Sequence, residues 1–141
     1  MSNASFKMNG VEVFSENAQT VTLKNINVDP SDTTTPSMCK AWVNFNGTLE
    51  LDNTAPETAG DYMIIRASYN VQSVQWNGTG DYTVNFTTAM PDANYSVVGA
   101  TLYARTIFGI NTISTGSVRV SGYDEGSGYY NSSIFCVAIF R

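Results

Sequence analysis

Hydrophobic and polar residues alternate most clearly in 69–95, where two segments rich in β-branched and aromatic residues flank the loop 77–80. The loop reads Asn-Gly-Thr-Gly, residues that tolerate positive φ angles, and this is typical of a β-hairpin. In the second arm, Tyr82, Val84 and Phe86 alternate with Thr and Asn. This alternation predicts a strand with one face in the core.

The first arm of this hairpin predicts an irregularity. Its apolar residues at 69 and 71 have one parity, whereas those at 74 and 76 have the other. An extra residue in the strand would let both pairs face the core. We therefore expect a β-bulge near Gln72-Ser73.

The rest of the chain also consists of short extended segments. The segment 95–106 is apolar on both sides, which predicts an interior strand. The segment 134–140, IFCVAIF, is also apolar on both faces, and we expect it in the middle of a sheet or in a subunit interface, because an exposed edge of this kind would aggregate. With about eight to ten short strands and no helical period, the chain is predicted to be all-β, a single β-sandwich or jelly-roll-like domain.

One segment is typical of a linker. Residues 29–37, DPSDTTTPS, contain no large apolar side chain. We expect an N-terminal attachment segment and linker in 1–38, with a weak strand pattern at 11–14 and 21–28, and a β-sandwich domain in 39–141.

The composition excludes several classes of function. The chain has no histidine, the commonest general base and metal ligand, which excludes protease-like triads in their usual form. Its net charge is −5 and its seven Lys and Arg residues are scattered, so nucleic acid is not an expected partner. No acidic loop has the spacing of a calcium site, and we predict no metal or cofactor.

The N-terminus and the cysteines bear on the compartment. The first residues have neither the basic nor the hydrophobic region of a signal peptide, and no apolar run is long enough to span a membrane, so we expect no secretion and no membrane insertion. Cys39 and Cys136 fit no zinc spacing. A disulfide between them is one interpretation, and two small buried hydrophobic side chains are the one we favour.

The best candidate binding segment is 122–130, a glycine-rich stretch that we predict to be a flexible loop. It carries Tyr123, Asp124, Tyr129 and Tyr130, and tyrosine combines a large contact area with a hydrogen-bonding tip, which suits the recognition of sugars. The alternative is that these tyrosines pack under the loop or between subunits.

Catalysis is a weaker hypothesis. A glycosidase needs two acids that face one bond, and the candidate pairs are Asp52 with Glu57, Asp61 with Asp81, and Asp124 with Glu125. Acids in loops are usually solvated, and nothing in the sequence places any pair across a cleft. We expect no enzymatic activity and assign no catalytic residue.

Three blocks of sequence resemble a known family. They are KAWVNFNG at 40–47, IRASYNV at 65–71 and NGTGDYTVNFTTAMPDANY at 77–95. Together they resemble the C-terminal domain of many tailed-bacteriophage tail-fibre and other virion structural proteins, notably of marine and cyanobacterial phages. The resemblance covers 39–141 and implies a β-rich virion protein that is commonly a trimer.

The resemblance implies a location and partners. We expect assembly in the host cytoplasm, a homotrimer in the virion, and contact with other virion proteins through 1–38. This segment is shorter than the shaft of a usual phage fibre, so a long fibre is not expected. Our first hypothesis is a short tail fibre or tail-tip adhesin that binds a host surface glycan through 122–130. The alternative is a head decoration (cement) protein that stabilises the capsid and has no receptor role.

Overall fold

The computed structural model describes residues 5–8, 11–15, 38–102 and 106–141, with side chains for 38–102 and 107–141. Strands β1 (Ser5–Met8) and β2 (Val11–Ser15) pair antiparallel, with Met8 opposite Val11. The described pair includes the residues 11–14 for which the sequence predicted a weak strand pattern. The predicted linker 29–37 and the pattern at 21–28 lie outside the described residues.

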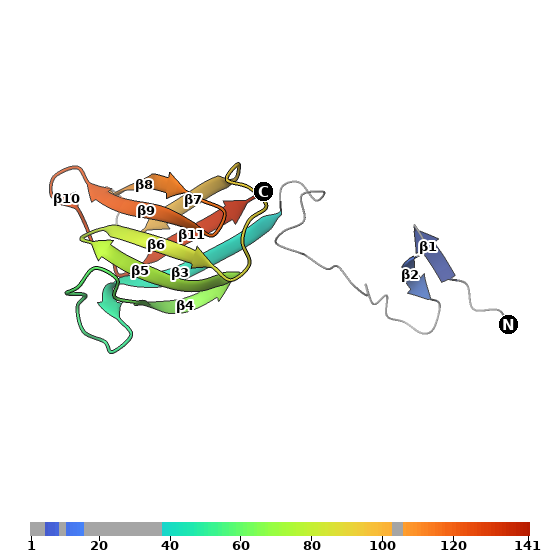
Figure 1. Ribbon diagram of the computed structural model, residues 1–141, viewed down its shortest axis with the longest axis horizontal. Helices are drawn as coiled ribbons and strands as arrows, with labels where there is room; N and C mark the ends of the chain where they lie inside the picture. Colours follow the sequence, from blue (N-terminus) through green and yellow to red (C-terminus); the bar gives the residue numbers. More distant parts are fainter. Residues whose placement is uncertain (1–4, 9–10, 16–37, 103–105) are drawn as a thin grey trace.

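The all-β prediction is confirmed, because nine strands form two antiparallel sheets that pack into a β-sandwich (Figure 1). One sheet has the order β4 (Met63–Tyr69), β3 (Cys39–Glu50), β11 (Phe135–Phe140) and β7 (Ser96–Thr101). In the other, β5 (Val71–Gly78) pairs with β6 (Asp81–Phe86), which pairs with β9 (Ser117–Asp124). Both β8 (Thr106–Ile113) and β10 (Gly128–Tyr129) also pair with β9.

The core lies between the sheets, and its centre is aromatic. The Phe135 ring stacks on Phe45 at 5.1 Å and contacts Tyr82 at 5.0 Å and Phe108 at 6.4 Å between centroids. Tyr82, Val84 and Phe86 are buried as the alternation predicted. These side chains supply the apolar burial that stabilises the fold.

A hydrogen-bonded group joins the two sheets at one end of this core. The Tyr82 hydroxyl lies 2.7 Å from the carbonyl oxygen of Gly47 and 2.8 Å from Oδ1 of Asn131. Burial raises the pKa of Tyr82, so the hydroxyl stays protonated and keeps its role as a donor. A Cβ at Gly47 would stand 2.6 Å from this hydroxyl, which explains a glycine inside β3.

The chain passes from one sheet to the other at Asn70, a left-handed residue with φ of 53°. Its side-chain amide donates to the carbonyl oxygens of Lys40 and Thr88, and its Oδ1 accepts from the Thr88 N–H at 2.7 Å. The prediction that the hairpin at 69–95 includes Tyr69 is therefore wrong, because Tyr69 ends β4 in the opposite sheet and is exposed. The predicted bulge is confirmed, because the β5–β6 register shifts between Val71 and Ser73.

The C-terminal strand lies where its sequence predicted, inside a sheet. In the described part of the chain, β11 pairs with β3 on one side and with β7 on the other. The interior position expected for 95–106 is wrong, because β7 is the edge strand of this sheet. Val98 of β7 points outward and is 55% exposed. Its apolar side chain therefore belongs to the outer surface of the sheet and is not buried in the core.

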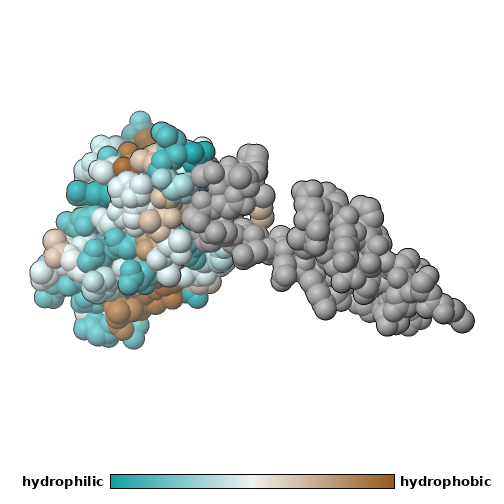
Figure 2. All heavy atoms as spheres, turned by 45° about the vertical axis from the view of Figure 1, so that its right-hand side comes forward, coloured by the Kyte–Doolittle hydropathy of each residue, from teal (hydrophilic) through white to brown (hydrophobic). Residues whose placement is uncertain are grey.

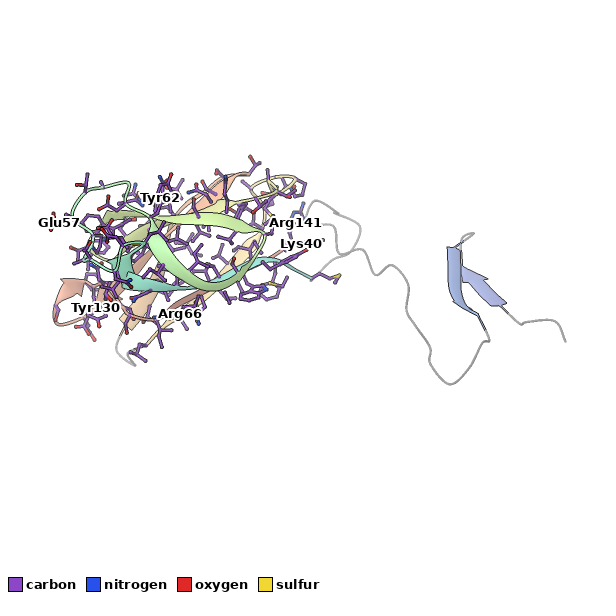
Figure 3. All side chains as sticks on the ribbon, turned by 90° about the horizontal axis from the view of Figure 1, so that it is seen from below. Lys40, Glu57, Tyr62, Arg66, Tyr130 and Arg141 are labelled. Carbon is purple, nitrogen blue, oxygen red and sulfur yellow. The ribbon has the colours of Figure 1, made fainter. Side chains whose placement is uncertain are left out.

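The two outer faces of the sandwich differ in chemistry. Tyr62 and Arg66 point to opposite sides of the sandwich in Figure 3. In Figure 2 most of the visible sandwich surface is hydrophilic or neutral, and hydrophobic residues gather along the lower rim, the side on which β4 lies in Figure 1, with a smaller group near the top. Cys39 and Cys136 are half-buried free thiols at opposite ends of the β3–β11 pair, where Cys39 lies opposite Phe140 and Cys136 opposite Asn44.

Candidate functional site

The outer surface of the β5–β6–β9–β8 sheet, which we call the polar face, brings together residues that are far apart in the sequence. Cross-strand register aligns Gln75, Thr83, Arg119 and Thr112 in one row, and Tyr129, Tyr123 and Ile107 in another. Further polar side chains of this face are amides, hydroxyls and one acid, among them Ser73, Asn77, Asp81, Asn85 and Asn111, while Ile110 of β8 is an exposed apolar residue in the same sheet. The face therefore offers many hydrogen-bonding groups and an aromatic end.

The amide side chains of this face are held in place by their neighbours. The Asn85 amide nitrogen donates to the Ser73 hydroxyl at 3.1 Å and to Oε1 of Gln75 at 3.3 Å. The Asn77 amide donates to the Thr83 hydroxyl at 2.9 Å. Side chains fixed in this way lose less conformational entropy when a ligand binds.

The charged groups among these outward residues form a pair. Arg119 donates to both carboxylate oxygens of Asp81, at 2.8 Å from Nε and 2.6 Å from Nη2. Partial burial acts to raise the pKa of Asp81, but the hydrogen bonds from Arg119 and Asn77 and the Arg119 charge outweigh it and hold this pKa below its ordinary value. The pair leaves the polar face close to electrically neutral.

We expect Asp81→Asn to lower the free energy of unfolding at neutral pH by at most about 1 kcal/mol, because the ion pair is partly exposed. A carboxyl group with a depressed pKa in the folded state stabilises the protein above its ordinary pKa of 3.8, and this contribution is lost as the pH falls through the folded-state pKa. The difference between wild type and variant should thus vanish in acid. Chemical denaturation at several pH values measures it.

A double-mutant cycle provides the control for this prediction. Adding Arg119→Gln to Asp81→Asn should cost less than the sum of the two single substitutions. Strictly additive costs, or a difference that persists unchanged in acid, would show that the pair does not stabilise the fold.

A polar hollow of ≈ 540 Å³ lies at the opposite end of the polar face from Tyr123 and Tyr129. It is lined by Gln72, Ser73, Gln75 and Asn85, with the half-exposed ring of Tyr62 beside them. A backbone bridge between Tyr62 and Gln75 holds the Tyr62 backbone beside β5. Amides supply both donors and acceptors, and the ring supplies an apolar surface, so the hollow suits a ligand with hydroxyl groups and apolar patches.

The structure brings two of the four predicted binding residues together. Tyr123 and Tyr129 are 41% and 57% exposed, and their rings meet edge to face with centroids 5.7 Å apart. The segment is a hairpin and not the flexible loop that we expected, because β9 and β10 pair across it. Asp124 forms the turn: its Oδ1 accepts from the N–H groups of Gly126 and Ser127, and Gly128 has a φ of 83°.

The other two predicted residues have separate environments. The Asp124 carboxylate is engaged by the turn, so its part in the site is to hold the hairpin. Tyr130 is half-buried, and its N–H donates to the Gly122 carbonyl oxygen at 3.0 Å. The exposed ring pair is made by Tyr123 and Tyr129.

Sequence reasoning missed several residues of the polar face. Tyr62 stood in a segment that we treated as an acidic loop, and Arg119 stood between two buried valines with no visible partner. The pairing of β6 with β9 creates the contact between Asp81 and Arg119. The alternation at 81–86 did indicate a polar side for this strand, but we favoured an ordinary solvated surface for it.

The aspartates considered for catalysis accept hydrogen bonds that hold local structure. Asp52 accepts from Thr54, Asp61 accepts from the N–H groups of Glu57 and Thr58, and Asp81 binds Arg119. Among the residues described, no group of three or more Cys, Asp or Glu side chains is arranged to hold a metal ion. Within the same residues no helix has the length and apolar character needed to cross a membrane.

Comparison of this chain with protein-family models, with characterised proteins and with solved structures gives no match.

Proposed function

We propose that this protein is a bacteriophage virion structural protein, a short tail fibre or tail-tip adhesin that binds a neutral host-surface glycan through its polar face. The observation that carries the proposal is the pairing of exposed tyrosines with rows of amide and hydroxyl side chains on one side of a rigid sheet. Such a face is suited to binding and provides no acid–base pair for catalysis, so the proposed activity is recognition without a cofactor.

The chemistry of the face favours a neutral sugar. Sugars have hydroxyl rims and apolar faces, which match amide groups and tyrosine rings respectively. An anionic sugar would need a cation, and the guanidinium of Arg119 is already bound to Asp81 in a bidentate arrangement. The two aromatic positions, Tyr62 at one end and the ring pair of Tyr123 and Tyr129 at the other, give a chain-like glycan two points of contact.

The virion location rests on the sequence blocks at 40–47, 65–71 and 77–95 and on the β-sandwich that contains them. A homotrimer attached to other virion proteins through 1–38 would present several polar faces together. Weak binding by each copy then becomes strong attachment, because linked sites raise the effective concentration of the ligand.

Tyr129→Ala is expected to weaken binding to host cells by about tenfold, which corresponds to about 1.4 kcal/mol, because it removes half of the exposed ring pair. The measurement is retention of fluorescently labelled protein on cells of the bacterium whose phage carries it, together with protection of those cells from infection. Leu51→Ala, at a side chain that is 68% exposed outside the polar face, is the control and should bind as wild type does.

Failure of the purified protein to bind these cells at any concentration, or equal binding by Tyr129→Ala, would contradict the adhesin. The alternative is a head decoration protein, which the apolar outer surface of the second sheet favours, since such a surface can pack against capsid subunits. A decoration protein would be present in far more copies per particle than a tail component. Quantitative mass spectrometry of purified particles distinguishes the two.

A further inference from the structure

Much of the outer surface of the β4–β3–β11–β7 sheet is apolar. Register places Tyr69, Trp42, Ala138 and Val98 in one row, and Cys136 and Ala100 side by side in the next, where Asn44 lies on the other side of Cys136. We call the six residues other than Asn44 the apolar face. None of them is charged, although the whole chain has a net charge of −5.

The apolar face has a projection and a depression next to each other. Trp42 is 39% exposed, an unusual position for the largest apolar side chain. Trp42 also lines an open hollow of ≈ 500 Å³, together with residues of β11 and β7 that include the small Gly99, Ala100, Cys136 and Ala138. A single copy of the chain therefore presents both a large side chain and a space for one.

This hollow is poorly suited to a small ligand. Ligand pockets carry a few polar groups that fix the orientation of the molecule bound. The polar side chain that lines this hollow is Asn44, and its Oδ1 already accepts from Nη1 of Arg66 at 3.2 Å. Arg66 also donates to the carbonyl oxygen of Ser133 at 2.6 Å, which keeps its guanidinium at the border of the face. The surface is thus suited to another apolar protein surface.

We propose that the apolar face is the surface through which copies of this chain associate, with Trp42 of one copy in the hollow of its neighbour. Two arguments select a second copy as the occupant. Two copies of an acidic chain avoid placing like charges against each other when they meet at an uncharged surface, and the six residues of this face are uncharged. The projection and the hollow also lie on the same face, so identical copies supply both halves of the contact.

The arrangement also fits the energetics of interfaces. Tryptophan in a desolvated pocket is among the side chains that contribute most to binding. Association through this face would leave the opposite, polar face open on every copy. The proposal depends on the function proposed above in one respect: the number of copies in the oligomer, three, comes from that function.

The test is the mass of the full chain in solution, measured by light scattering and analytical ultracentrifugation over a range of concentrations. Wild type should form an oligomer, and Ala138→Glu should weaken its association at least tenfold, because a charge would be buried between copies. Val98→Glu should act in the same way, and its side chain is already 55% exposed on an edge strand, so folding is not at risk. Ile107→Glu, at an exposed side chain on the polar face, should leave the mass unchanged.

A second measurement follows Trp42 directly in a Trp76→Phe background, where Trp42 is the remaining tryptophan. As the protein is diluted and the copies separate, the Trp42 ring should become more accessible, and a collisional quencher should reduce its fluorescence more strongly. A monomeric wild type, or an oligomer that persists in both glutamate variants, would overturn the proposal. If wild type is a dimer that both glutamate variants abolish, the contact through the apolar face is supported and only the trimer is contradicted. The glycan-binding result for Tyr129→Ala does not affect the masses measured here.

Discussion

Phe135→Ala is expected to lower the free energy of unfolding by about 3–5 kcal/mol, the usual cost of removing a buried aromatic ring. Phe135 is fully buried where the rings of Phe45, Tyr82 and Phe108 meet it from both sheets. Its loss leaves a cavity that these rings cannot fill without leaving their preferred rotamers. Equilibrium denaturation in urea measures the change as a shift in the midpoint at constant slope.

Leu51→Ala is the comparison for this substitution, because Leu51 is exposed and outside the core. Its effect should be within about 0.5 kcal/mol. If Phe135→Ala cost no more than Leu51→Ala, the two sheets could not be packed around this ring.

Gly80→Ala is expected to lower the free energy of unfolding by about 2–5 kcal/mol, from backbone strain and from overpacking together. Gly80 has a φ of 65°, and a Cβ there would stand 2.5 Å from the Tyr130 nitrogen and 2.6 Å from the Gly122 oxygen. Both contacts are backbone atoms, which cannot rotate away. The Gly80 N–H also donates to Asn131 at 2.6 Å, so displacement of the turn would disturb the group around Tyr82.

Gly116→Ala provides the matched control, since nothing lies within 4 Å of a Cβ at Gly116 and its φ is not in the left-handed region. This variant should be as stable as wild type or slightly more stable, because alanine reduces the entropy of the unfolded chain. Thermal denaturation of Gly80→Ala and Gly116→Ala compares their melting temperatures, and only Gly80→Ala should melt at a lower temperature than wild type. Equal melting temperatures for the two alanine variants would contradict the packing described for Gly80.

The sequence predicted the local features of the fold well. The alternation of Tyr82, Val84 and Phe86, and the parity change that requires a bulge near Ser73, depend only on neighbouring residues and on burial. The interior position of 134–140 followed from its apolar character on both sides. The same argument failed for β7, because an apolar strand at a sheet edge has the same pattern when the outer surface beside it is also apolar.

The candidate site was less predictable, because it depends on which strands pair. Tyr123 and Tyr129 were identified by residue type, and a signal for the hairpin between them was present in the Asp-Glu-Gly-Ser-Gly turn. Tyr62 and Gln75 meet through one backbone bridge, and Arg119 reaches Asp81 only across the β6–β9 pair. Such contacts join residues that are distant in the chain, and no local pattern specifies them.

The position of β11 affects how the protein folds during synthesis. Ribosomes release β3, β4 and β7 before residues 135–140, yet within the described sheet β3 and β7 are joined only through β11. Until it arrives, the nascent sheet is divided into two parts, each with an unpaired edge. Folding of this sheet must therefore await the final residues of the domain, and contacts of such long sequence separation form slowly.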